Sequence, residues 1–123
     1  MVSSSTSTST SKPTKYQLSF YVPLANLEAC KTAIFAAGAG CYPGSGNYTE
    51  ACFTIVHGGV GQFRPGKDAN PHIGTVGELE TVQEARVETL CVGEDVARRA
   101  VAALKEAHPY EEVAYQVVKM EDF

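Results

Sequence analysis

The 123-residue sequence lacks any apolar run of about 18 residues or more, the length that a membrane-spanning helix requires. It also lacks clustered positive charge, because its 10 lysines and arginines are scattered and are outnumbered by 14 acidic residues. Proteins that bind nucleic acids usually gather basic residues on one face. These absences predict a soluble protein that binds neither membranes nor nucleic acids.

The four cysteines, at positions 30, 41, 52 and 91, lack the short Cys-x-x-Cys spacing that is typical of zinc sites. No signal peptide is recognisable, so we expect reduced thiols and a cytoplasmic protein. Catalysis by Cys41 or Cys52 would require a neighbouring base, and no motif supplies one. A buried or half-buried thiol is the simpler interpretation.

Residues 1–14 (MVSSSTSTSTSKPT) contain almost no side chain that could enter a core, and this composition predicts a disordered Ser/Thr-rich tail. A transit peptide is the alternative, but the segment lacks arginine and an amphipathic face. Residues 15–123 are enough for a single domain. A domain of this size buries a small core, so an oligomer interface would add appreciably to its stability.

Hydrophobic periodicity predicts two similar units, each with the order strand, helix, strand. The predicted elements are strands at 16–22, 48–57, 62–64, 82–92 and 113–117, and helices at 27–37 and 94–108. Asn26 is the expected N-cap of the first helix and Gly38 its left-handed C-terminal cap. Pro109 should end the second helix, because proline cannot continue a helix.

This order of elements fits the α+β class, as a ferredoxin-like βαββαβ sandwich. Right-handed crossovers would place both helices on one face of an antiparallel sheet. The other face then needs a cover, for which we expect another subunit. The long loop at residues 65–79 is unusual in a small domain unless it binds something or packs on a neighbouring subunit.

The segment from Ala107 to Tyr115 places an imidazole, a phenol and two carboxylates at the joint between a helix and a strand, where functional residues are common. His108 could instead be structural, since an imidazolium is favoured at a helix C-terminus. A metal could recruit histidines and glutamates, but no pair has the i, i+4 helical spacing of many metal sites. The candidate ligands are His57, His72, His108, Glu88, Glu111 and Glu112.

The glycine-rich segments at 38–46 and 58–61 do not identify a cofactor. A phosphate-binding P-loop needs Gly-Lys-Ser/Thr opening a helix, whereas a strand is expected after residue 46. The second segment is not followed by the helix that a dinucleotide-binding fingerprint requires. Turn formation explains these glycines, and the cofactor, if there is one, stays unknown.

Seven segments in this order resemble the PII/CutA-like domain of the Ngg-interacting-factor-three-like (YqfO-type) family, over about residues 15–119. They are residues 16–24, 35–40, 47–48 together with 52–53, 61–65, 69–74, 84–88 and 107–112. The resemblance implies a ferredoxin-like fold, trimer-type assembly as in PII and CutA proteins, and a ligand cleft between subunits. The turn at 41–46 is longer than the corresponding turn in the family.

In larger members of that family the domain is inserted in a body that carries a two-metal site and is often labelled a type 2 GTP cyclohydrolase. The histidine and carboxylate ligands of that site belong to the body and have no counterpart in this sequence. The resemblance therefore carries neither the metals nor a hydrolase activity over to this chain.

We therefore predict a non-catalytic, oligomeric binding or regulatory module that holds a small anionic ligand or a divalent ion in a subunit cleft. Its candidate ligand-binding residues are Arg64, Asn70, His72, His108, Tyr110 and Glu111. Arg64 would bind an anion or a carboxylate across the interface, and His108 with Glu111 would form a switchable or ion-binding pair. Two alternatives stay open: a purely structural oligomerisation protein, and a hydrolase-type enzyme that uses His108 and Glu111 as acid and base.

Overall fold

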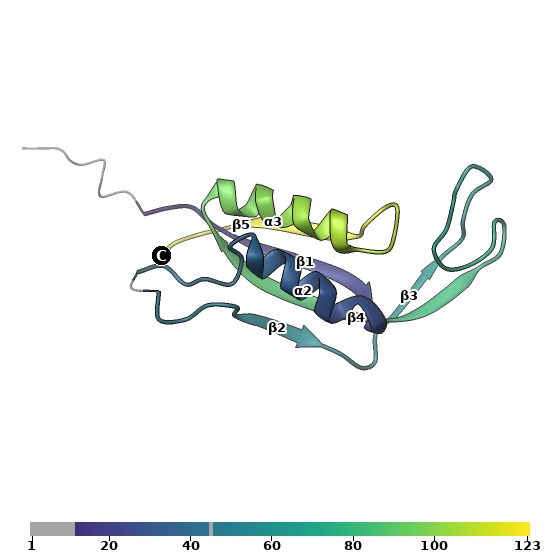
Figure 1. Ribbon diagram of the computed structural model, residues 1–123, viewed down its shortest axis with the longest axis horizontal. Coiled ribbons are helices and arrows are strands. Elements are labelled where there is room, and N and C mark those ends of the chain that lie inside the picture. The colour runs from purple at the N-terminus through teal and green to yellow at the C-terminus, as the bar shows by residue number, and fades with distance from the viewer. Residues whose placement is uncertain (1–11, 45) are drawn as a thin grey trace, which may run out of the picture.

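A single antiparallel sheet carries both α-helices on one of its faces, as predicted (Figure 1). The computed structural model describes residues 12–44 and 46–123. Its elements are β1 (Lys15–Pro23), the 3₁₀ turn η1 (Leu24–Asn26), α2 (Leu27–Ala36), β2 (Cys52–Ile55), β3 (Val60–Phe63), β4 (Glu80–Val92), α3 (Glu94–Ala107) and β5 (Tyr115–Met120). The strand order is β2-β4-β1-β5, and β3 pairs with β4 as well.

The core lies between the sheet and the two helices, and the alternation in β1 determines which side chains enter it. Leu18, Phe20 and Val22 point toward the helices and have no exposed surface. β4 and the helices complete this layer with residues at strand and helix spacing. They are Ala85, Val87 and Cys91 from β4, Leu27, Cys30 and Ile34 from α2, and Ala97, Ala100 and Leu104 from α3.

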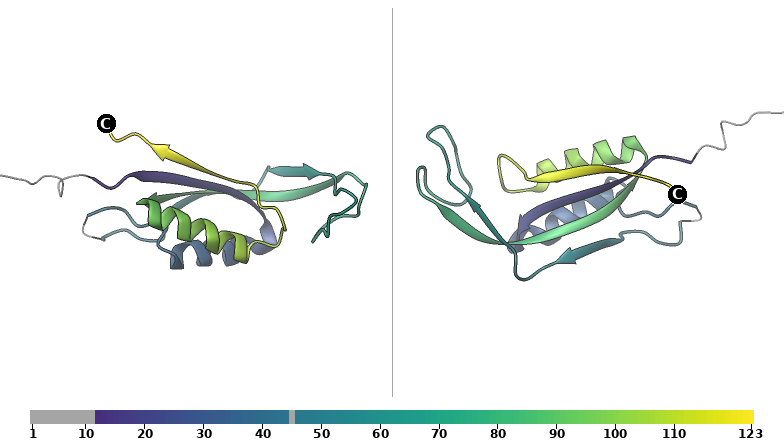
Figure 2. Two further views of the ribbon diagram at one scale, coloured as in Figure 1. Left: turned by 90° about the horizontal axis from the view of Figure 1, so that it is seen from above. Right: turned by 180° about the vertical axis from the view of Figure 1, so that it is seen from behind.

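No helix of the described residues covers the opposite face of the sheet, as the view from behind in Figure 2 shows. On this face Phe53 and Ile55 of β2 pair with Glu88 and Arg86 of β4. Phe53 is 61% exposed and Ile55 is 47% exposed. At the other edge Val118 of β5 is 53% exposed. Apolar side chains thus stand in solvent at both edges of this face, which we call the open face.

β4 is long enough to pair with three strands, and its residues 86–89 pair with β2. Its C-terminal part, residues 84–92, pairs with β1, and residues 80–83 pair with β3. We call residues 60–83 the arm: it consists of β3, the loop 64–79 and the start of β4. Figures 1 and 2 show the arm extending past the end of both helices. The arm therefore projects beyond the part of the sheet that the helices cover.

The prediction of one strand over 48–57 and another over 62–64 was wrong in its boundaries. Ile55 pairs with Arg86 and Val60 with Gln83, so five steps along the chain match three steps along β4. The two extra residues fall in the segment 56–59, where Gly58 has a positive φ of 93°. An irregular stretch of this kind bends a strand pair and redirects the chain beyond it. Here it separates β2 from the arm.

The predicted helix ends are close to those observed. Gly38 has a φ of 108° after α2, as a left-handed cap requires, and α3 ends at Ala107 before Pro109. Asn26 occupies the N-cap position of α2 but makes no side-chain cap hydrogen bond, which corrects the capping prediction. The 3₁₀ turn η1 precedes the helix instead, and the Leu27 N–H donates to the Leu24 carbonyl.

Most of the predicted tail, residues 1–14, lies outside the described residues. At its end the Thr14 carbonyl accepts a hydrogen bond from the Gly93 N–H at 2.7 Å. Within residues 12–44 and 46–123, neither helix has the length and apolar character needed to cross a membrane.

Candidate functional site

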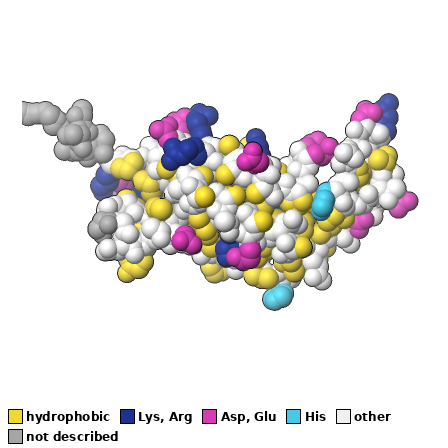
Figure 3. Space-filling view, in the orientation of Figure 1, with side chains coloured by type: hydrophobic (Ala, Val, Ile, Leu, Met, Phe, Trp, Pro, Cys, Tyr) yellow, Lys and Arg dark blue, Asp and Glu magenta, His cyan; other side chains and the backbone are white. Residues whose placement is uncertain are grey.

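A pocket of about 870 Å³ lies between the arm and the segment 108–114, which we call the turn. The turn joins α3 to β5, and the surface in Figure 3 is indented between the helix-bearing body and the projecting arm. Most side chains that line the pocket are apolar, aromatic or glycine, with a few charged groups among them. The charged and histidine side chains in the lining are Arg64, Arg86, Glu84, Glu111, Glu112, His57 and His72.

The arm loop is closed at its base by two hydrogen bonds to Gly77. Arg64 donates from a guanidinium nitrogen to the Gly77 carbonyl at 2.8 Å, and the Gly77 N–H donates to the Pro65 carbonyl at 2.8 Å. A guanidinium has five N–H donors, so this contact positions Arg64 without exhausting it. Arg64 is therefore held at the pocket with donors to spare.

His108 anchors the turn to β1 and lies behind the pocket lining, with only 6% of its surface exposed. Its Nδ1 accepts a hydrogen bond from the Tyr110 N–H at 3.1 Å, so the other ring nitrogen carries the proton in the neutral form. That Nε2 donates to the Tyr21 carbonyl at 2.7 Å. Both nitrogens are thus engaged inside the domain, and the structure does not pair His108 with Glu111.

Burial lowers the pKa of His108 from its ordinary value of 6.5, against the opposing effects of the Tyr21 hydrogen bond and the Glu84 charge. Because the unfolded chain then binds a proton more readily, folding stability should be complete above about pH 6.5 and fall as the pH drops below it. We expect the melting temperature of the parent to fall more steeply between pH 7.5 and 5.5 than that of a His108→Gln variant.

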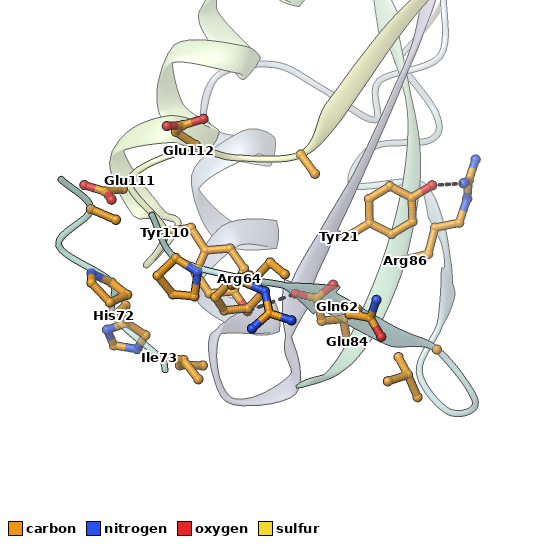
Figure 4. Close-up of a pocket in the computed structure, with 18 of the residues that line it drawn as sticks. Tyr21, Gln62, Arg64, His72, Ile73, Glu84, Arg86, Tyr110, Glu111 and Glu112 are labelled. Atoms are coloured by element: carbon orange, nitrogen blue, oxygen red, sulfur yellow. Dashed lines mark hydrogen bonds between the residues drawn. The ribbon is translucent and has the colours of Figure 1, made fainter. Parts of the chain in front are cut away.

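Tyr110 projects from the turn into the pocket and donates from its hydroxyl to Glu84 Oε2 at 2.9 Å (Figure 4). Burial, followed by this contact with a carboxylate, raises the pKa of Tyr110 above its ordinary value of 10, so the phenol stays a donor at neutral pH. Its ring packs against Phe63 of β3, with the ring centres 5.9 Å apart. Tyr110 therefore joins the turn to β3 of the arm and to β4 at Glu84.

A second contact between the arm and the turn involves Asn70 and Glu111. The Asn70 backbone N–H donates to Glu111 Oε1 at 3.1 Å across 41 positions of sequence. The side chain of Asn70 is not part of the pocket lining, whereas Glu111 is. The loop and the turn thus form facing walls that are joined at their edge.

Tyr21 and Arg86 form another part of the lining, on β1 and β4. Arg86 donates to the Tyr21 hydroxyl at 2.6 Å and to Glu88 Oε2 at 2.9 Å. Figure 4 shows the first of these contacts at the end of the pocket away from Glu111. Because Glu88 neutralises Arg86, this guanidinium is occupied within the chain.

The residues predicted from sequence fall into two groups. Arg64, His72, Tyr110 and Glu111 line the pocket, whereas His108 and Asn70 support it through hydrogen bonds. No group of three or more histidine, cysteine, aspartate or glutamate side chains within residues 12–44 and 46–123 is placed to hold a metal ion.

Two lining residues with a clear role were not predicted, namely Glu84 and Phe63. Glu84 lies on the face of β4 that points away from the helices, and its position in the strand does not reveal its contact with Tyr110. The alternation in β4 could have indicated a role for Glu84, because a carboxylate that points outward from a strand can contact a segment packed on that face. The position of the turn, however, could not be deduced from that pattern.

No protein-family model matches the chain. A relative from Bacillus subtilis (strain 168), named GTP cyclohydrolase 1 type 2 homolog, is 40% identical over 105 residues, which are 85% of this chain and 26% of the relative. A relative of the same name from Mycobacterium leprae is 41% identical over 98 residues, 79% of this chain and 24% of its own length. The chain thus spans about a quarter of the length of these curated relatives.

Among solved structures, a Bacillus cereus protein related to NIF3 superposes with a TM-score of 0.72 at 33% identity, over 92% of this chain and 27% of that protein. CutA from Xylella fastidiosa superposes with a TM-score of 0.59 at 18% identity, over 89% of this chain and 86% of CutA. GlnK from B. subtilis gives a TM-score of 0.52 at 12% identity, over 87% and 85% of the two chains. The last two likenesses show the fold alone. The chain has the PII/CutA-like fold and is homologous to a segment of NIF3-family proteins that makes up about a quarter of their length.

Proposed function

We propose that this chain is a non-catalytic binding or regulatory module and that the pocket between the arm and the turn holds a small ligand. The observation that carries the proposal is the contact between Asn70 and Glu111, which brings two irregular segments of distant sequence together as walls of one cavity. Irregular segments on a rigid scaffold are common places for binding residues. The apolar lining and the few charged groups are also typical of small-molecule sites.

Arg64 is the residue that we assign to an anionic group of the ligand. It lines the pocket, is exposed, and forms no ion pair among the described residues. A guanidinium held by one hydrogen bond keeps other donors for a carboxylate or a phosphate. A divalent ion has less support, since the described residues offer no cluster of three ligands.

His108 supports this site without acting in it. A general acid or base must reach the proton that it transfers, and both nitrogens of His108 are bound to the domain itself. The ring fixes the position of Tyr110 by accepting its N–H and by packing edge-on, with the ring centres 4.9 Å apart. This arrangement favours a binding module over an enzyme that uses His108 and Glu111.

The module acts as a homo-oligomer, in which copies of the chain meet through the open face. Phe53 and Ile55 are the exposed apolar groups that such an interface would bury. A trimer is the assembly that the resemblance to PII and CutA proteins implies.

The test is a binding screen on the parent protein by NMR and thermal shift, with small carboxylates, phosphates, nucleotides and divalent ions. We expect at least one anionic compound to bind, and its affinity to fall about tenfold or more in Arg64→Gln, because hydrogen bonds to charged groups are strong. Arg98→Gln is the matched control, since Arg98 is an exposed α3 residue paired with Glu94. Equal binding by both variants, or no binding by the parent, would contradict the proposal.

A further inference from the structure

We propose that the ligand of this pocket is zwitterionic: besides the anionic group at Arg64, it carries an amine that binds the carboxylate of Glu84. The proposal rests on the function assigned above to Arg64 and adds a second charged end to the same ligand. It depends on how the chain holds Glu84, on what surrounds this carboxylate, and on the other charges in the lining.

The position of the Glu84 side chain depends on the glycines in and beside β3 and on Tyr110 of the turn. The side chain lies across β3, where a Cβ at Gly61 would collide with the carboxylate. A Cβ at Gly59 would lie 2.7 Å from the Glu84 carbonyl oxygen, which is equally too close. Tyr110 then fixes one carboxylate oxygen through its hydroxyl. Gly61 thus leaves the space that the carboxylate occupies, and the Tyr110 hydroxyl fixes its position in the pocket lining.

This carboxylate has no cation of its own among residues 12–44 and 46–123, where none of the ion pairs involves Glu84. A carboxylate can accept about four hydrogen bonds, so the one from Tyr110 leaves most of its capacity unused. An amine of the ligand would supply both the positive charge and the missing donors.

The rings of Phe63 and Tyr110 suit the same amine. They belong to the lining beside Glu84 and are inclined at 56° to each other, so their faces have different directions. Aromatic faces attract ammonium groups, particularly where water is excluded. The apolar part of the ligand can pack on the same rings.

The charges of the whole lining argue against a ligand that is only anionic. Three carboxylates face two guanidinium groups, and one of these, Arg86, is already paired with Glu88. Arg64 is therefore the single unpaired guanidinium against the carboxylates of Glu84, Glu111 and Glu112. An anion bound at Arg64 would be repelled by them unless the same molecule brought a positive group.

The experiment compares three probes with the same six-carbon skeleton: 6-aminohexanoate, hexanoate and hexylamine. They are titrated into the parent protein and followed by NMR at millimolar concentrations, which suit such small molecules. The flexible chain lets the charged ends adapt to their separation in the pocket. We expect 6-aminohexanoate to bind about tenfold more tightly than either singly charged probe.

Glu84→Gln is the variant that isolates the amine contact, because an amide oxygen still accepts from Tyr110 and the volume hardly changes. It should reduce 6-aminohexanoate binding about tenfold and leave hexanoate binding unchanged or stronger. Glu106→Gln removes the same charge at an exposed position of α3 outside the pocket and should bind like the parent. The resonances of the turn should match those of the parent, which shows that Tyr110 is still in place.

Three outcomes would overturn the inference in different ways. If hexanoate binds as tightly as 6-aminohexanoate and Arg64→Gln weakens both, the zwitterion is wrong while the anionic site stands. If hexylamine binds as tightly and Arg64→Gln changes nothing, the anionic site fails as well. If none of the three probes binds although the screen above yields an anionic ligand, the proposed contact between a ligand amine and Glu84 is wrong.

Discussion

Replacing His108 with alanine is expected to lower the free energy of unfolding by about 3 kcal/mol, because the change removes two hydrogen bonds and leaves a cavity. The Tyr21 carbonyl and the Tyr110 N–H would lose their partners next to the core. The residue is only 6% exposed, so water cannot easily replace the ring. Urea denaturation of parent and variant measures the difference directly.

His72→Ala is the matched control for that experiment, since His72 is exposed and should change the stability by less than about 0.5 kcal/mol. The His108→Ala variant also separates a positioning role of His108 from direct ligand binding. Since we propose that His108 positions the turn and does not contact the ligand, His108→Ala should weaken ligand binding in proportion to the loss of order in the turn. A stable His108→Ala protein that loses only its ligand would show that the imidazole itself binds.

Replacing Phe53 with glutamate is expected to dissociate the proposed oligomer, with the dissociation constant rising about 30-fold or more. Phe53 is the most exposed apolar side chain of β2, and its cross-strand partner on the open face is Glu88. A carboxylate there would lose apolar contact with the neighbouring subunit and stand opposite a like charge. Light scattering on a dilution series gives the mass of each species.

Val76→Glu is the control for the oligomer, because Val76 is 43% exposed but belongs to the arm loop and not to the open face. It should keep the mass of the parent at every concentration. If the parent is monomeric, or if Phe53→Glu keeps the parental mass, the open face is not the interface.

The fold could be predicted from the sequence wherever a single period was strong. In β1 and β4 the alternation groups Phe20 and Val87 with the other buried apolar side chains of their strands, because the period of a strand is fixed at two. Ser19, on the other face of β1, is nevertheless only 2% exposed. α3 could be placed by its apolar stripe and by Pro109, which removes the hydrogen bond that would continue it. These effects act between residues that are close in the sequence, so the sequence pattern alone can reveal them.

The site could be predicted less completely because it depends on contacts between distant segments. Arg64 and Tyr110 were chosen as polar or aromatic residues in irregular segments, and the structure places both in one pocket. The contacts of Glu84 with Tyr110 and of Asn70 with Glu111 depend on where the arm points. That direction is set by the two extra residues between β2 and β3, which no periodicity shows. His108 was recognised as important, but its burial depends on β1, which lies far away in the sequence.

The most direct test of the binding function is an NMR chemical-shift map of the parent protein with the anionic compound that binds best in the screen. Our account predicts saturable shifts that concentrate in residues 60–73 of the arm and 108–114 of the turn. Saturable shifts in the groove lined by Tyr16, Val101 and Tyr115 on β1, α3 and β5 would contradict it. So would a protein that gives no saturable shifts with any compound of the screen.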